Sequence, residues 1–386
     1  MSAEPPHVPF NRPYMVGREL EYIAEAVRSG HLAGDGLFTK RCQAWLEQAL
    51  GARKVLLTHS CTAALEMSAI LCDLEPGDEV IMPSFTFVST ANAFLLRGAR
   101  PVFVEIRSDT LNLDEGRVEA AITPRTRAIV PVHYAGVSCE MDSLLGIARR
   151  HGLRIIEDAA QGIQATYKGR PLGAMGDMGT LSFHETKNLI SGEGGALVIQ
   201  DEDLLTRAEI IRDKGTDRAR FFRGEVDKYT WVDIGSSYLP SELIAAFLFA
   251  QLEKADAIMS TRHRIFDTYR DALEDLEQRG WLRLPVVPEE CHHNAHLFYV
   301  LLRDEEQRDG LLAHLNEKGI NGIFHYVPLH QSPMGQRLGY RSGDLPLTEE
   351  MSLRVIRLPS FFELASDQQD RVVEELRRWL RHRNAR

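Results

Sequence analysis

The amino-acid sequence predicts an α/β protein: a large domain with a mainly parallel central sheet flanked by helices, followed by a smaller C-terminal α+β domain. The chain has 386 residues, 44% of them hydrophobic, which is enough for two domains. Short apolar runs recur in its first half and are continuous rather than alternating, as in strands covered on both faces. Helical stretches separate most of the runs, which favours parallel strands. We expect domains of residues 1–255 and 256–386, and strands at 55–57, 80–82, 102–104, 129–132, 155–156 and 197–199.

The N-terminal part of the large domain is expected to begin with helices. Residues 18–28 form an amphipathic pattern, and Gly34-Asp35-Gly36 forms a glycine-rich loop. Thr39 is expected to cap a second helix that runs to residue 50 and ends at Gly51. These helices precede the first apolar run.

The C-terminal part is expected to combine helices with a few strands. A long helical region from residue 241 to about 280 leads out of the large domain. Ser366 and Gln369 have the spacing of a capping box before the last helix, whose apolar residues fall on one face and form core. The expected elements of the small domain are strands at 297–302 and 323–327 and helices at 307–318 and 367–381.

The composition argues against several classes of function. The formal net charge is -10, and basic residues are dispersed among acids except at the C-terminal end, so we expect no nucleic-acid partner. The five cysteines are scattered and contain no C-x-x-C pair, which argues against a disulfide framework and a metal site and fits a reducing cytoplasm. No apolar run approaches the roughly 18 residues that a membrane span requires. We therefore expect a cytoplasmic protein with small-molecule partners.

A lysine lies between a short apolar strand and the glycine-rich segment 192–195. Lys187 stands where a scaffold could hold an amine over a bound ligand. An amine that forms a Schiff base must lose its proton near neutral pH, and partial burial next to a cationic cofactor achieves that. Most lysines beside glycine-rich turns are solvated loop residues, so this segment alone does not decide between the two interpretations. Ser182, at the end of the same strand, could bind a phosphate.

Ligands of parallel α/β sheets bind outside the carboxyl ends of the strands, so the residues after each strand matter most. Cys61 and Thr62 open a helix there and offer backbone amides and a hydroxyl at its positive end, which suits a phosphate. The alternative is that Ser60 is a plain N-cap with no ligand.

Two further strand ends suit a flat, positively charged ring. Asp158 could keep a pyridinium nitrogen protonated, and Gln161 could reach a ring hydroxyl, although D-x-x-Q is also a helix capping box. Phe85 and Phe87 could stack on the ring, or simply belong to the core. Phosphate donors, an aromatic ring, a carboxylate and a lysine, in this order along one α/β domain, together predict pyridoxal 5'-phosphate (PLP) as the cofactor.

Six segments also carry a resemblance to a known family. They are residues 34–36 (GDG), 60–65 (SCTAAL), 83–93 (PSFTFVSTANA), 131–136 (PVHYAG), 157–161 (EDAAQ) and 182–188 (SFHETKN). From residue 9 to residue 359 the chain resembles the PLP-dependent sugar-nucleotide aminotransferases, which have the aspartate aminotransferase type of fold, PLP fold type I. The roles that the resemblance implies are Schiff-base lysine for Lys187, partner of the pyridine nitrogen for Asp158, neighbour of the ring hydroxyl for Gln161, ring-stacking residue for Phe87, and phosphate ligands for Cys61, Thr62 and Ser182.

The resemblance further implies a homodimer with shared active sites. In many members an asparagine of a G-Y-N-Y segment reaches the cofactor phosphate of the neighbouring subunit. Here the segment reads Gly235-Ser236-Ser237-Tyr238, so this role falls to Ser237 or Ser236, or is lost.

The reaction implied by the family is transfer of an amino group, most often from glutamate, to the 4-ketone of a nucleotide-linked deoxysugar. Residues 221–239 most resemble members that form dTDP-4-amino-4,6-dideoxygalactose for enterobacterial common antigen, so we expect dTDP-4-dehydro-6-deoxy-D-glucose as substrate. Tyr326 and His330 could contact sugar or diphosphate, or be partly buried residues of the small domain. Alternatives are a transaminase that gives the gluco epimer and one that uses another nucleotide-linked 4-ketosugar. A sugar dehydrase would need histidine in place of Lys187, and a non-catalytic sensor would not need Lys187, Asp158 and Ser182.

Overall fold

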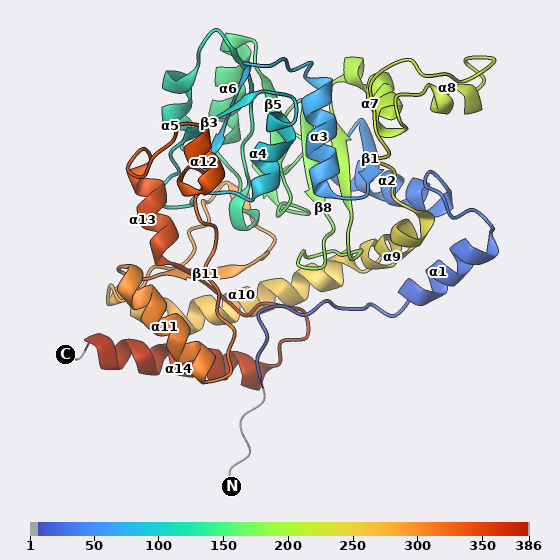
Figure 1. The fold of residues 1–386 in the computed structure, drawn as a ribbon. Helices are drawn as coiled ribbons and strands as arrows, with labels where there is room; N and C mark the ends of the chain where they lie inside the picture. The colour runs from blue at the N-terminus through green and yellow to red at the C-terminus, as the bar shows by residue number, and fades with distance from the viewer. Residues whose placement is uncertain (1–6, 385–386) are drawn as a thin grey trace.

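The computed structural model describes residues 7–384 and confirms the predicted α/β class. Figure 1 shows a central sheet between helices, with a smaller group of helices and strands from the last third of the chain beside it. The sheet has the strand order β1-β9-β8-β5-β4-β2-β3, and β9 alone of these seven runs in the direction opposite to the others. Its strands are β1 Lys54–Thr58, β2 Glu79–Pro83, β3 Arg100–Val104, β4 Thr126–Ile129, β5 Arg154–Asp158, β8 Met178–Ser182 and β9 Gly195–Ile199.

Both faces of this sheet are buried, as the continuous apolar runs predict. Val55 and Leu57 of β1 belong to one core cluster and Leu56 to another, because successive side chains of a strand point to opposite faces. The first cluster is completed by α1 Glu19–Arg28, α2 Leu37–Leu50, α6 Met141–His151 and α9 Glu242–Leu252, and the second by α3 Cys61–Leu71, α4 Val88–Leu95 and α7 Leu205–Arg212.

Helices and strands of the last third of the chain enclose a third core cluster. Val8 is wholly buried in this third cluster and pairs with Ile320. Within residues 7–384, no helix is long and apolar enough to cross a membrane. The domain boundary near residue 255 stays a prediction. The helices and strands not yet named are α5 Glu115–Val118, α8 Arg218–Phe222, α10 Ala255–Gln278, α11 Glu305–Glu317, α12 Pro333–Arg337, α13 Pro346–Arg354, α14 Ser366–Asn384, β6 Thr166–Tyr167, β7 Arg170–Pro171, β10 Cys291–His292, β11 Phe298–Leu301 and β12 Val355–Leu358.

The predicted cap of the second helix is wrong. Helix α2 begins at Leu37, and its N-terminal amides are satisfied by Glu242 from the start of α9. This buried carboxylate accepts hydrogen bonds from the amides of Gly36, Phe38 and Thr39 at 3.0, 2.7 and 3.1 Å. Negative charge at a helix N-terminus is stabilising, and here it comes from a residue about two hundred positions away.

The strand expected at residues 323–327 is absent. Ile323 makes a single bridge to Arg357, and β12, which was not predicted, pairs with β11 instead. Tyr326 has a φ of 42°, which interrupts an extended chain. The capping box of α14 is also wrong, because Gln369 donates to the carbonyl of Ile265, whereas Gln368 accepts from the amide of Ala365.

Candidate active site

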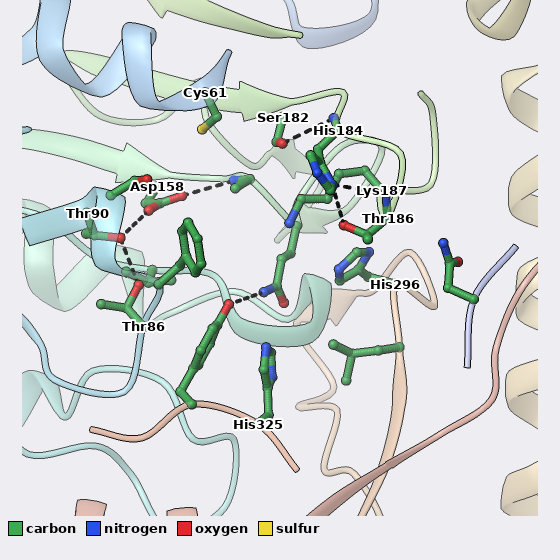
Figure 2. A pocket seen from close by; sticks show the side chains of 18 of the residues that line it. Cys61, Thr86, Thr90, Asp158, Ser182, His184, Thr186, Lys187, His296 and His325 are labelled. Carbon is green, nitrogen blue, oxygen red and sulfur yellow. Dashed lines mark hydrogen bonds between the residues drawn. The ribbon is translucent and has the colours of Figure 1, made fainter. Parts of the chain in front are cut away.

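A cavity of about 780 Å³ lies at the carboxyl ends of the central strands, and residues of the smaller unit form its opposite wall. This is the size of a pocket for a cofactor together with a substrate. Figure 2 shows Cys61 and Ser182 on one side of it, Asp158 at one end, and His325 across from Ser182. All but two of the predicted site residues line the cavity: Cys61, Thr62, Phe87, Asp158, Gln161, Ser182, Lys187 and Tyr326.

Lys187 follows β8 in a tight loop that is tied to the glycine-rich segment. The amide of Glu185 donates to the carbonyl of Gly192 at 2.8 Å, and the amide of Lys187 donates to the carbonyl of His184 at 2.9 Å. The Lys187 side chain is half-buried by its surface area. Burial of the amine lowers the pKa of Lys187, and the positive charge of Arg357 lowers it further, against the opposing effects of Cys61 and Asp158. A larger fraction of this amine is therefore neutral near pH 7 than in a free lysine.

The N-terminus of α3 faces the cavity with Cys61 and Thr62. Ser60 is indeed the N-cap, because its hydroxyl accepts from the amide of Ala63 at 3.1 Å, and the same helix end lines the cavity. A Cβ atom added to Gly195 would lie 2.4 Å from the nitrogen of Cys61, so glycine lets β9 pass this close. Burial raises the pKa of the Cys61 thiol to about 12, so the thiol stays neutral and does not repel an anion.

A second helix start adjoins the first. The hydroxyls of Thr62 and Ser89 lie 2.8 Å apart, and Ser89 belongs to the first turn of α4. Ser182 closes the same region from the end of β8. The arrangement offers hydroxyls and helix-terminal amides to one anion. Ser89 lies inside a segment that the sequence analysis singled out, but no role was predicted for it.

Asp158 ends β5 and points into the cavity, whereas its neighbour Glu157 points the other way. Glu157 is held by the amides of Gly173, Met175 and Gly176. One oxygen of Asp158 accepts from the hydroxyl of Thr90 at 2.7 Å. No helix follows β5 directly, so the alternative interpretation of Asp158 and Gln161 as a capping box is wrong. Alternation along the strand selects which carboxylate reaches the cavity.

Gln161 lies beyond Asp158, and its amide oxygen and one of its amide hydrogens form hydrogen bonds within the protein. Its Oε1 accepts from the amide of Ala135 at 2.7 Å, and its Nε2 donates to the Tyr326 hydroxyl at 3.1 Å. Phe87, the residue before α4, is 59% exposed and lines the cavity, whereas Phe85 is buried in a core cluster. Of the two aromatic residues predicted together, only Phe87 offers its ring to a ligand.

The opposite wall contains cavity residues that were not predicted. Arg357 on β12 stacks on the Phe10 ring at 4.8 Å and donates through Nη2 to the carbonyl of Phe324 at 3.1 Å. Its Nε is buried without a partner, and no carboxylate of residues 7–384 pairs with this guanidinium. His296 is buried beside it, and burial lowers the pKa of His296 well below its usual range. The available signal for Arg357 was a single charge inside the apolar run V-I-R-L.

His330 and Ser237 do not line the cavity. His330 is wholly buried, with its nitrogens 2.7 Å from the Ser84 hydroxyl and 2.9 Å from a Glu349 oxygen. Both ring nitrogens are thus engaged within the protein, and the structure does not bring His330 to the cavity; its contact with substrate stays a prediction. Ser237 is exposed and forms a bridge with Asp213. Its expected contact with a partner's phosphate stays a prediction.

The groups around the cavity fit PLP. Two helix starts and Ser182 suit its phosphate, Asp158 suits its ring nitrogen, and the half-buried amine of Lys187 suits its aldehyde. The groups come from the ends of β1, β2, β5 and β8, as expected for a ligand site in a sheet of this type.

Comparison with known proteins agrees with this chemistry. The sequence pattern of the DegT/DnrJ/EryC1/StrS aminotransferase family matches residues 13–377. The spore coat polysaccharide biosynthesis protein SpsC of Bacillus subtilis is 35% identical over 379 residues, with 96% of each chain covered. GDP-perosamine synthase of Caulobacter vibrioides is 33% identical over 375 residues, which cover 96% of this chain and 98% of that protein. The crystal structure of S. venezuelae DesV superposes with a TM-score of 0.88 at 34% identity, covering 97% and 99% of the two chains.

These similarities extend over almost the whole chain and include the cavity. The aminotransferases of this family bind PLP, and solved relatives are in PLP and pyridoxamine phosphate forms. The protein is therefore a PLP-dependent sugar aminotransferase and belongs to the DegT/DnrJ/EryC1/StrS family.

Proposed function

We propose that the protein transfers the amino group of L-glutamate to C4 of dTDP-4-dehydro-6-deoxy-D-glucose. The products are dTDP-4-amino-4,6-dideoxy-D-galactose and 2-oxoglutarate. The observation that carries the catalytic part of this proposal is the convergence of Lys187 and Asp158, from the ends of two neighbouring strands, on one cavity. A non-catalytic sensor would not need a half-buried amine opposite a carboxylate.

Each residue of the cavity has a proposed task. Asp158, oriented by Thr90, holds the proton at the ring nitrogen of PLP. Gln161 meets the ring oxygen, Phe87 stacks on the ring, and the helix start at Cys61 and Thr62 binds the phosphate together with Ser182 and Ser89. When bound, PLP supplies an electron-accepting ring that stabilises negative charge at the substrate carbon.

Lys187 is the proposed proton carrier of the reaction. Its amine takes the proton from the Cα atom of glutamate and, in the second half of the reaction, delivers one to C4 of the sugar. Because burial lowers its pKa, a larger fraction of the amine is in the neutral form that accepts a proton than in a free lysine. The orientation of the sugar relative to this amine sets the configuration at C4.

We infer that a carboxylate of the donor binds Arg357. The guanidinium lines the cavity, and the protein does not neutralise it with a carboxylate within residues 7–384. Lys187 lines the same cavity, and the positive charge of Arg357 contributes to lowering the pKa of Lys187. The α-carboxylate of an amino acid is one bond from the reacting carbon, whereas the diphosphate of a nucleotide sugar is bonded to C1, across the ring from C4. The place of Arg357 in the cavity that also contains Lys187 therefore favours the donor.

The choice of sugar rests on residues 221–239, which resemble enzymes that form dTDP-4-amino-4,6-dideoxygalactose. The 33% identity with GDP-perosamine synthase favours a second candidate, a GDP-linked 4-keto-6-deoxysugar. The two candidates share all the cofactor residues named above, so they differ only in how the nucleotide and hexose are held.

We also propose a homodimer in which Ser237 reaches the cofactor phosphate of the partner subunit. Ser237 is exposed and outside the cavity of its own chain. The arm that contains α8 extends away from the sheet (Figure 1), and it exposes Phe222 by 69% and Trp231 by 78%. Large apolar side chains gathered on a projecting arm are typical of an interface.

The substrate is tested with a panel of dTDP-, UDP- and GDP-linked 4-keto-6-deoxysugars and 15N-labelled glutamate. We expect label in the sugar only with the dTDP compound, and a small H3–H4 coupling by NMR because the galacto amine is axial. A large coupling would identify the gluco epimer. Preference for the GDP sugar would establish the second candidate, and absence of label in every sugar would contradict the proposed function.

A further inference from the structure

The loop of residues 323–330 is held against the cavity in a conformation that needs support. The φ of 42° at Tyr326 is left-handed backbone, which bulky residues seldom adopt because it costs free energy. Such strain persists only where the surrounding structure fixes the residue, and it is concentrated at functional sites. The contacts of this loop therefore indicate which side chain the strained conformation positions.

One anchor of the loop leads from Tyr134 to the cavity. The Tyr134 hydroxyl lies 2.8 Å from Nδ1 of His325, and both side chains are buried. The ring of His325 stacks on that of Tyr326 with centroids 3.6 Å apart. Burial lowers the pKa of His325 well below its usual range, so the ring is neutral and forms an uncharged hydrogen bond. The position of Tyr134 thus fixes that of Tyr326 through His325, which Figure 2 shows at the cavity.

The second anchor fixes the other end of the loop. The amide of Leu329 donates to the carbonyl of Ser84 at 2.9 Å, and His330 is bonded to the Ser84 hydroxyl at 2.7 Å. With this end fastened beside β2, the remaining freedom of the loop is at Phe324 to Val327, whose side chains at 324 and 327 are exposed. The bond between Tyr134 and His325 restrains this freer part.

The contact that Tyr326 makes in return is with Gln161. The Gln161 Oε1 accepts from Ala135, and one of the two Nε2 hydrogens goes to the Tyr326 hydroxyl. A primary amide has two N–H donors, so one hydrogen remains. Because the amide is planar, the bonds to Ala135 and Tyr326 together fix the direction of this last hydrogen.

We propose that Tyr134 and His325 are positioning residues, which hold Tyr326 against Gln161 so that the remaining amide hydrogen of Gln161 meets the ring oxygen of PLP. Neither residue was singled out for a role by the sequence. The proposal rests on the assignment of Gln161 to the ring oxygen and is independent of the identity of the sugar.

The test uses the PLP-loaded enzyme without substrate and follows its visible absorbance as a function of pH. A hydrogen-bond donor to the ring oxygen stabilises negative charge on that oxygen. The proton that this oxygen shares with the nitrogen joining Lys187 to PLP is therefore lost at a lower pH. Tyr134→Phe should therefore raise the pH midpoint of the absorbance change by about 0.4 to 1 unit, the equivalent of one ordinary hydrogen bond. Tyr326→Phe should raise it by a similar amount.

The double variant Tyr134→Phe/Tyr326→Phe separates positioning from a general structural effect. If both residues act through Gln161, the double variant shifts the midpoint no further than Tyr326→Phe alone. The matched control is Tyr299→Phe, a buried tyrosine with its ring 5.7 Å from that of Tyr134 and no place in the chain of contacts, which should leave the midpoint unchanged.

An unchanged midpoint in Tyr134→Phe, or additive shifts in the double variant, would overturn the proposal. Thermal unfolding of each variant shows whether it is folded. Should Tyr134→Phe fail to fold with PLP, His325→Gln interrupts the same chain from the other side and carries the same expectation. Because no sugar is used, the result does not depend on whether the proposed substrate is right.

Discussion

Replacing Arg357 with glutamine should impair the reaction with glutamate far more than the reaction with the sugar. The guanidinium lines the cavity without a carboxylate partner among the described residues, and we propose that it receives one from the donor. A hydrogen bond between charged groups contributes about 1.5–3 kcal/mol. Loss of about 2–3 kcal/mol corresponds to a roughly 30- to 150-fold weaker affinity for glutamate.

The assay separates the two halves of the reaction. Stopped-flow absorbance follows the PLP form as glutamate consumes it, and the dependence of the rate on glutamate concentration gives the apparent affinity. Arg357→Lys keeps the charge but not the planar fork, so its affinity should lie between those of the wild type and Arg357→Gln. The control is Arg354→Gln, which removes a guanidinium paired with Glu350 outside the cavity. It should bind glutamate as the wild type does.

Two results would refute this reasoning. One is an unchanged affinity for glutamate in Arg357→Gln, which would mean that the donor's carboxylate binds elsewhere. The other is an equal loss in the reaction of the aminated enzyme with the nucleotide sugar, which would mean that Arg357 serves both substrates or supports the fold. Measurement of both half reactions on the same preparation distinguishes the two.

Lys187→Ala should lower turnover by at least about a thousandfold, equivalent to roughly 4 kcal/mol, while thermal unfolding shows an intact fold; a smaller loss of turnover would count against the proton-carrier role. Since burial and Arg357 lower the pKa of Lys187, attachment of PLP to the apo protein should reach its plateau at a lower pH than for a free lysine, and a midpoint as high as that of a solvated lysine would contradict this. Ser237→Ala should weaken PLP retention about fivefold, the value of one hydrogen bond of about 1 kcal/mol, and sedimentation should show a dimer; a fully active monomer at micromolar concentration would exclude the shared site. Glu242→Gln should lower the free energy of unfolding by about 2–3 kcal/mol in chemical denaturation, because an amide cannot accept from all the donors around Thr39; unchanged stability would show that this cap is dispensable.

The large sheet and the cofactor end of the cavity could be predicted because both follow from local pattern. A continuous apolar run predicts a buried parallel strand, and a parallel strand places the residues that follow it at the ligand edge. Asp158 at the end of β5 and Ser182 at the end of β8 can thus be identified without knowledge of any other contact. Alternation along the strand also explains why Glu157, one residue earlier, is a structural carboxylate on the opposite face.

The parts that could not be predicted depend on partners that are distant in sequence. Thr39 is a good local cap, yet in the folded protein the carboxylate of Glu242 lies at the helix start. Because it is charged, it forms stronger hydrogen bonds than a hydroxyl, and it accepts from several amides at once. Arg357 is likewise placed by the pairing of β12 with β11, two strands separated by more than fifty residues. The sequence pattern within each segment contains no information about these long-range contacts.

The opposite outcomes for Tyr326 and His330 have a single geometric cause. In an extended segment the side chains at 324, 326, 328 and 330 would share one face. The left-handed φ of Tyr326 and the turn at residues 329–331 break that alternation. Tyr326 then faces Gln161 in the cavity, while His330 turns toward Ser84 and Glu349 in the interior. Because a left-handed tyrosine is unfavourable by itself, the contacts that stabilise it, and not the local sequence, decide which of the two residues reaches the cavity.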